Sequence, residues 1–133
     1  MLPSPADHVA ISALFARYCL TLDVNDVEGW IDLYLPDARY EVYGRSWEGH
    51  EGLRKMSAGA PHGLHLGGPP VVEMDGADRA RITRNLLFLE QQTGVSRSAV
   101  YEDELRRTPA GWRIAFTRCQ FITPDGLRDR PDR

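Results

Sequence analysis

The spacing of apolar residues changes once along this chain, and that change limits the folds available to it. Between Ile11 and Leu22, apolar side chains recur every three or four residues, which predicts one face of a helix. From Gly63 to Ile122 they alternate with polar residues, which predicts strands with one buried face. Helices followed by a long antiparallel meander indicate an α+β domain.

Three helices are expected in the first part of the chain. The first follows Pro5, and the second is capped by Asn25-Asp26 and ended by Pro36. The apolar face of this second helix consists of Val27, Trp30, Ile31 and Tyr34. A strand over 38–43 and a short helix over 49–57 complete this part.

Four strands are expected in the rest of the chain: 65–73, 79–92, 96–108 and 112–122. The turns between them are supplied by Asp75-Gly76, Gly94 and Pro109-Ala110-Gly111. The run Gly67-Gly68-Pro69-Pro70 interrupts the first of these strands rather than forming a phosphate-binding loop. Residues 1–133 are expected to form a single domain with a mobile, charged tail over 124–133.

A strongly bent sheet wrapped against the helices would enclose a pocket, and the strand faces indicate what lines it. In the last strand Ile114 and Phe116 share a face, which Arg118 continues. In the second strand of the meander Phe88 lies on the same face as Glu90. Arg118 and Glu90 are therefore expected to be charges at the ends of apolar stripes, as in a pocket with a few polar groups.

Composition and motifs exclude several classes of protein. The net charge of −3 argues against nucleic acid as the main partner. No segment approaches the roughly 18 consecutive apolar residues of a membrane span, and no signal peptide is recognised, so a cytoplasmic protein is expected. Cys19 and Cys119 match no metal or redox spacing, which favours a pair of ordinary buried thiols. We therefore expect a protein that has neither a cofactor nor a metal site.

Two polar segments contain residues suited to proton transfer. The segment 18–23 ends the first helix with Asp23, and His65 stands near the start of the meander. A carboxylate that hydrogen-bonds a histidine fixes its tautomer and raises its basicity, so the pair would work as a dyad near neutral pH. If the two side chains do not touch, Asp23 would be an ordinary residue at the end of a helix. His65 would then be a strand residue hydrogen-bonded to the backbone.

The order and spacing of four motifs resemble the SnoaL-like branch of the nuclear-transport-factor-2-like superfamily, near scytalone dehydratase and bile-acid 7α-dehydratase. The motifs are Tyr18-Cys19-Leu20-Thr21-Leu22-Asp23 with Asp26 and Trp30, Pro36-Asp37-Ala38, His65-Leu66-Gly67-Gly68, and Gly111-Trp112-Arg113-Ile114. The resemblance covers residues 6–123. It implies a cone-shaped α+β barrel in which N-terminal helices pack on a strongly bent antiparallel sheet.

The resemblance also implies site residues. In those dehydratases the aspartate that ends the first helix pairs with a histidine at the start of the long strand, and these match Asp23 and His65. A tyrosine five residues before the aspartate helps to bind or polarise the substrate, and it matches Tyr18. From the residues alone, Tyr18 is equally suited to core packing, because it shares a helix face with Leu14 and Leu22.

Further matches suggest residues that would bind the substrate. A second tyrosine of those dehydratases falls near Val42 here, and Tyr40 shares the face of Val42. A third acid/base group falls near Phe88 or Glu90, depending on register, and Arg118 lies close to an arginine of the last strand. We therefore expect Tyr40 and these three residues to bind the substrate.

Asp103 alternates in phase with Tyr101 and Leu105 and is expected to face inward. In the related ketosteroid isomerases a protonated aspartic acid helps to form the oxyanion hole. Pairing with an arginine on the sheet is the favoured alternative.

These features predict a cofactor-independent lyase or isomerase that acts on a small, hydrophobic, oxygenated ring compound. His65, oriented by Asp23, would remove a proton from carbon next to a carbonyl. The alternative is a non-catalytic domain that binds a small hydrophobic ligand or supports an oxygenase as a β-subunit does; epoxide hydrolysis is a third possibility. Leu87 and Leu89, on the face opposite Phe88, fit an interface packed on the sheet, and the resemblance implies a homodimer or homotrimer.

Overall fold

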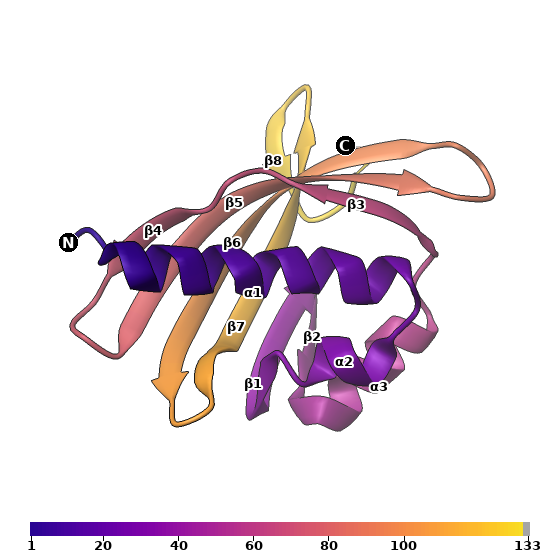
Figure 1. The fold of residues 1–133 in the computed structure, drawn as a ribbon. Coiled ribbons are helices and arrows are strands. Elements are labelled where there is room, and N and C mark those ends of the chain that lie inside the picture. Colours follow the sequence, from indigo (N-terminus) through magenta and orange to yellow (C-terminus); the bar gives the residue numbers. More distant parts are fainter. Residues whose placement is uncertain (132–133) are drawn as a thin grey trace.

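Helix α1 lies across a curved sheet, and α2 and α3 gather near one end of it (Figure 1). The computed structural model describes residues 1–131. The helices are α1 (Pro5–Asp23), α2 (Val27–Ile31) and α3 (Gly49–Ala58). The strands are β1 (Tyr34–Val42), β2 (Arg45–Glu48), β3 (Gly63–Gly67), β4 (Val71–Met74), β5 (Arg79–Glu90), β6 (Ser96–Thr108), β7 (Gly111–Thr123) and β8 (Gly126–Arg128). Within 1–131, no helix is long and apolar enough to cross a membrane.

The sheet follows the order β2-β1-β7-β6-β5-β3, with β4 paired to β5 and β8 paired to β7. The cone-shaped α+β fold expected from the sequence is confirmed, but the sheet is mixed because β1 runs parallel to β7. The expectation of a wholly antiparallel sheet was wrong at this one pair. Period-two alternation is the same in both kinds of strand, and no short turn joins β1 to β7, so the sequence holds no signal for their relative direction.

Helix α1 carries Asp23 to the edge of the sheet. Its first turn is capped by the Ser4 hydroxyl, which accepts a hydrogen bond from the Asp7 amide at 3.1 Å. The buried face of the helix consists of Ile11, Leu14, Phe15 and Tyr18. Because this face packs on the sheet, the end of the helix comes to lie beside β3.

Three segments differ from the sequence-based expectation. Tyr34 begins β1 instead of extending α2, and its buried ring lies 5.4 Å from that of Trp30. Strand β2 was not expected; it follows a turn in which Tyr43 and Gly44 both have positive φ, as two-residue hairpins require. Strand β8 lies within the expected mobile tail, of which residues 132–133 fall outside the described part of the chain.

A buried ion pair lies beneath α1. Arg84 and Asp103 are 3% and 2% exposed, and Arg84 Nε donates to Asp103 Oδ2 at 2.8 Å. The Thr117 hydroxyl donates to the other carboxylate oxygen at 2.7 Å. The guanidinium carbon lies 4.3–4.5 Å from the ring centres of Phe15, Tyr18 and Tyr101. Asp103 therefore faces inward and accepts hydrogen bonds from an arginine of the sheet, the arrangement that the sequence favoured.

Candidate active site

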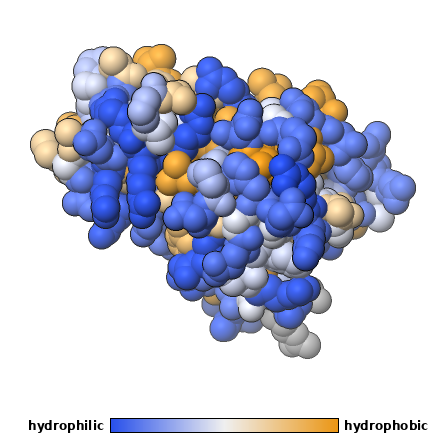
Figure 2. All heavy atoms as spheres, turned by 90° about the horizontal axis from the view of Figure 1, so that it is seen from below, coloured by the Kyte–Doolittle hydropathy of each residue, from blue (hydrophilic) through white to orange (hydrophobic). Residues whose placement is uncertain are grey.

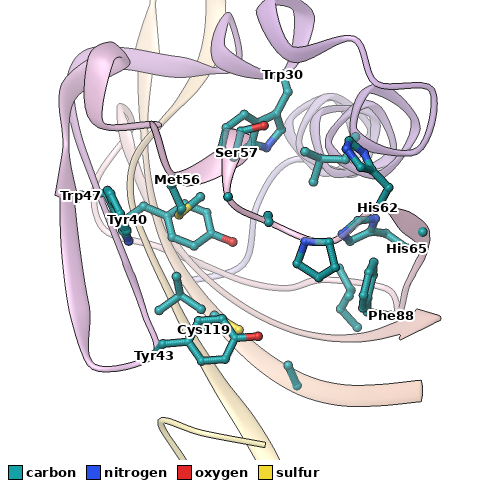
Figure 3. Close-up of a pocket in the computed structure, with 18 of the residues that line it drawn as sticks. Trp30, Tyr40, Tyr43, Trp47, Met56, Ser57, His62, His65, Phe88 and Cys119 are labelled. Atoms are coloured by element: carbon teal, nitrogen blue, oxygen red, sulfur yellow. The ribbon is translucent and has the colours of Figure 1, made fainter. Parts of the chain in front are cut away.

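A cavity of about 650 Å³ opens between the helices and the inner face of the sheet, and most of its surface is apolar (Figure 3). A volume of this size suits one small ring compound. Seen from below, the surface shows hydrophobic residues in the middle of the face with hydrophilic residues around them (Figure 2).

His65 lines this cavity, and Asp23 contacts His65 from behind the lining. Oδ1 of Asp23 lies 2.7 Å from His65 Nδ1, and the same oxygen accepts a hydrogen bond from the His65 backbone amide at 2.9 Å. Their side chains are only 16% and 15% exposed. Because a carboxylate can only accept, it selects the tautomer with hydrogen on Nδ1 and leaves the lone pair on Nε2.

Strand β3 holds the imidazole in a fixed place. His65 lies directly opposite Phe88 of β5 in the antiparallel ladder, and the two rings are 4.8 Å apart between centres. The contact with Asp23 joins residues 42 positions apart, so it depends on α1 and β3 packing together.

The pKa of His65 is lowered from 6.5, and burial is the main cause. The hydrogen bond and charge of Asp23 raise this pKa, as the sequence analysis expected, while the Arg84 cation lowers it further. Burial outweighs the carboxylate, so the net direction is opposite to the one expected from the dyad alone. The imidazole is therefore neutral at pH 7 and available as a base.

Tyr18 and Tyr40 form a second polar group in the cavity wall. Their hydroxyl oxygens are 2.6 Å apart, and both side chains line the cavity. Burial raises the pKa of Tyr18 to about 12 and that of Tyr40 well above 10. Both hydroxyls stay protonated near neutral pH. One O–H bonds the other hydroxyl, and the second remains to donate to a ligand oxygen. Tyr18 thus packs in the core and also lines the cavity.

Trp30 supplies a donor that the sequence analysis missed. Its side chain is 1% exposed and lines the cavity, and its Nε1–H has no hydrogen-bond partner in residues 1–131 (Figure 3). The sequence analysis placed Trp30 on an apolar helix face and in a family motif, and assigned it no role in hydrogen bonding. A buried indole N–H usually has a partner, so a tryptophan beside a pocket is itself a signal of a donor.

Of the other expected site residues, Phe88 lines the cavity and Glu90 does not, although both lie on the same face of β5. Arg118 is exposed and outside the cavity, which corrects the sequence-based expectation. A bulge in β7 is the cause: Leu105 pairs with Ile114, but Glu104 pairs with Phe116. The extra residue reverses which face of β7 the following side chains occupy. Arg118, which follows Thr117, therefore points outward.

Arg97 was missed from the sequence, whereas Tyr43 was noted only as a neighbour of Val42. Arg97, on β6, donates from Nη1 to the Tyr43 hydroxyl at 3.0 Å, and both line the cavity. Arg97 lies on the same face of β6 as Ala99 and Tyr101, so the alternation that placed Asp103 inward was also a signal for Arg97.

Residues 1–131 contain no group of three or more histidine, cysteine, aspartate or glutamate side chains placed to hold a metal ion. Cys19 and Cys119 are free thiols, and burial raises the pKa of both.

Many solved structures share this fold, and three of them serve as examples. An NTF2-like protein with a cystatin-like fold from Novosphingobium aromaticivorans has 25% identity and a TM-score of 0.80, covering 90% of this chain and 84% of its own. A variant of Rv3472, a protein of unknown function from Mycobacterium tuberculosis, has 30% identity and a TM-score of 0.78, covering 89% and 76%. The hexachlorocyclohexane dehydrochlorinase LinA-type3 from Novosphingobium barchaimii has 20% identity and a TM-score of 0.77, covering 89% and 88%.

The match to a family model says more about this chain than its likeness in fold to solved structures. No curated protein matches the chain. The model of the SnoaL-like domain matches residues 4–118, which is most of the sequence. The chain therefore belongs to the SnoaL-like family.

Proposed function

We propose that this protein is a cofactor-independent lyase or isomerase that removes a proton from a carbon atom of a small, hydrophobic, oxygenated ring compound. The observation that carries the proposal is the 2.7 Å contact between Asp23 Oδ1 and His65 Nδ1 at the wall of an apolar cavity. It leaves Nε2 of a neutral imidazole as the proton acceptor.

The proposed reaction begins when Nε2 of His65 takes the proton from carbon next to a carbonyl group. Asp23 stabilises the imidazolium that forms. The free hydroxyl hydrogen of the Tyr18–Tyr40 pair bonds the developing enolate oxygen; one such donor contributes about 2.7–4 kcal/mol. The imidazolium then protonates a leaving hydroxyl, which completes dehydration, or a different carbon, which completes isomerisation.

The comparisons support the coarse class of this reaction. The SnoaL-like family matches most of the chain, and one structural neighbour is named a dehydrochlorinase, which is an eliminating enzyme. Identity to that neighbour is 20%, so its substrate is not carried over.

The proposal is tested by proton exchange at carbon. 2-Tetralone, a ring ketone with acidic α-hydrogens, is incubated in D₂O at pH 7.5, and loss of its α-proton signals is followed by ¹H NMR. The protein is expected to exchange these hydrogens faster than buffer alone. Binding of 2-tetralone without faster exchange would contradict the proposal and favour the non-catalytic binding domain.

We also propose that the chain assembles as a homodimer or homotrimer through the outer face of β3 and β5. Leu64 pairs with Leu89 and Leu66 with Leu87, and all four side chains are more than 40% exposed. An apolar patch of this kind is typical of an interface. Light scattering is expected to give two or three subunits for wild type and a monomer for the double variant Leu66→Lys/Leu87→Lys. A monomeric wild type would contradict the proposal.

A further inference from the structure

The cavity carries an excess of positive charge that the proposed reaction does not use. Its lining contains no aspartate or glutamate within the described residues. It contains four cationic residues: Arg45, Lys55, Arg97 and Arg130. Since the chain as a whole has a net charge of −3, this excess does not reflect its composition.

None of the four cations forms an ion pair within residues 1–131. Arg45 stacks on the ring of Trp47, with its guanidinium carbon 4.4 Å from the ring centre. Arg97 is half-buried and bonds only the neutral hydroxyl of Tyr43. A guanidinium has five N–H donors, so Arg97 keeps several for another group. Uncompensated cations beside an apolar cavity attract an anionic ligand.

The strand register places Arg97 in line with the base. His65 on β3 lies opposite Phe88 on β5, and Phe88 lies opposite Arg97 on β6. Residues directly opposite in a ladder point to the same side, and all three line the cavity. Two interstrand spacings of about 4.8 Å put the backbones of His65 and Arg97 roughly 10 Å apart. A ring lying over Phe88 would have the base at one side and the guanidinium at the other.

We propose that the ligand of this cavity is a ring compound that bears a carboxylate, and that Arg97 is the residue that selects for it. The planar fork of a guanidinium matches a carboxylate in geometry as well as in charge. The other three cations strengthen the attraction from the rim. This inference depends on the proposed function only in taking the same cavity as the ligand site.

The experiment compares 2-naphthoate with 2-naphthamide, which have the same ring and nearly the same shape but differ in charge. Each is titrated into the full chain, and binding is followed by the fluorescence of Trp30 and Trp47, both of which line the cavity. Wild type is expected to bind the naphthoate at least tenfold more tightly. Arg97→Gln is expected to lose most of this preference and Arg97→Lys to keep part of it.

The matched control is Arg106→Gln, which removes the same charge from an exposed position of β6 outside the cavity. It is expected to keep the wild-type preference, and circular dichroism checks that all variants fold. Equal affinity for the two probes, no binding of either, or a folded Arg97→Gln with unchanged preference would each overturn the inference. His65→Gln separates the two proposals: it is expected to lose proton exchange and keep the preference for naphthoate.

Discussion

His65→Gln is expected to slow the exchange of 2-tetralone about 10³-fold relative to wild type, because glutamine offers no base for the α-proton. Asp23→Asn is expected to slow it about 10²-fold. The amide lacks the negative charge that stabilises the imidazolium, and it no longer fixes the hydrogen on Nδ1. Both rates are measured by the NMR exchange assay in D₂O.

His8→Gln is the matched control for these two variants, because His8 is exposed on α1 and its ring bonds only the Ser12 hydroxyl within the described chain. It is expected to exchange 2-tetralone at the wild-type rate. Wild-type activity in folded samples of both His65→Gln and Asp23→Asn would contradict the dyad.

Asp103→Ala is expected to lower the free energy of unfolding by about 3–5 kcal/mol, the usual cost of leaving one partner of a buried ion pair alone. The variant leaves Arg84, which is 3% exposed, without a counter-ion and leaves the Thr117 hydroxyl without its acceptor. Urea unfolding followed by circular dichroism measures the change.

The double variant Arg84→Met/Asp103→Leu tests whether charge causes this loss. It replaces both ions with apolar side chains of similar length, and it is expected to be clearly more stable than Asp103→Ala. A loss below about 1 kcal/mol in Asp103→Ala, or a double variant that is less stable than the single one, would show that the pair contributes little.

The contact between Asp23 and His65 could be anticipated because the sequence around each residue indicates where that residue lies in the fold. Helical spacing indicates where α1 ends, and period-two alternation indicates where the meander begins. The resemblance to known dehydratases supplied the pairing, which no spacing along the chain contains. The inward position of Asp103 followed in the same way from simple alternation.

The positions that the sequence did not reveal depend on register or on burial. Arg118 continues the face of Ile114 only if β7 is regular, and the bulged residue between Ile114 and Phe116 moves Arg118 to the outer face. The inward face of Arg97 follows from the alternation of β6, but its place beside Phe88 depends on the register between β5 and β6. The direction of the His65 pKa follows from burial competing with a nearby carboxylate, and the extent of burial is known only once the helices are packed on the sheet.

The most direct test of the central claim is the titration of His65 by NMR in wild type and in Asp23→Asn, with the ring signals assigned from their absence in His65→Gln. The wild-type pKa is expected below 6.5, because burial disfavours the charged ring. In Asp23→Asn it is expected to fall further, because the carboxylate raises this pKa. Exchange activity should then decline as the pH drops through the wild-type value. An unperturbed pKa that is the same in both proteins would contradict the dyad and, with it, the proposed function.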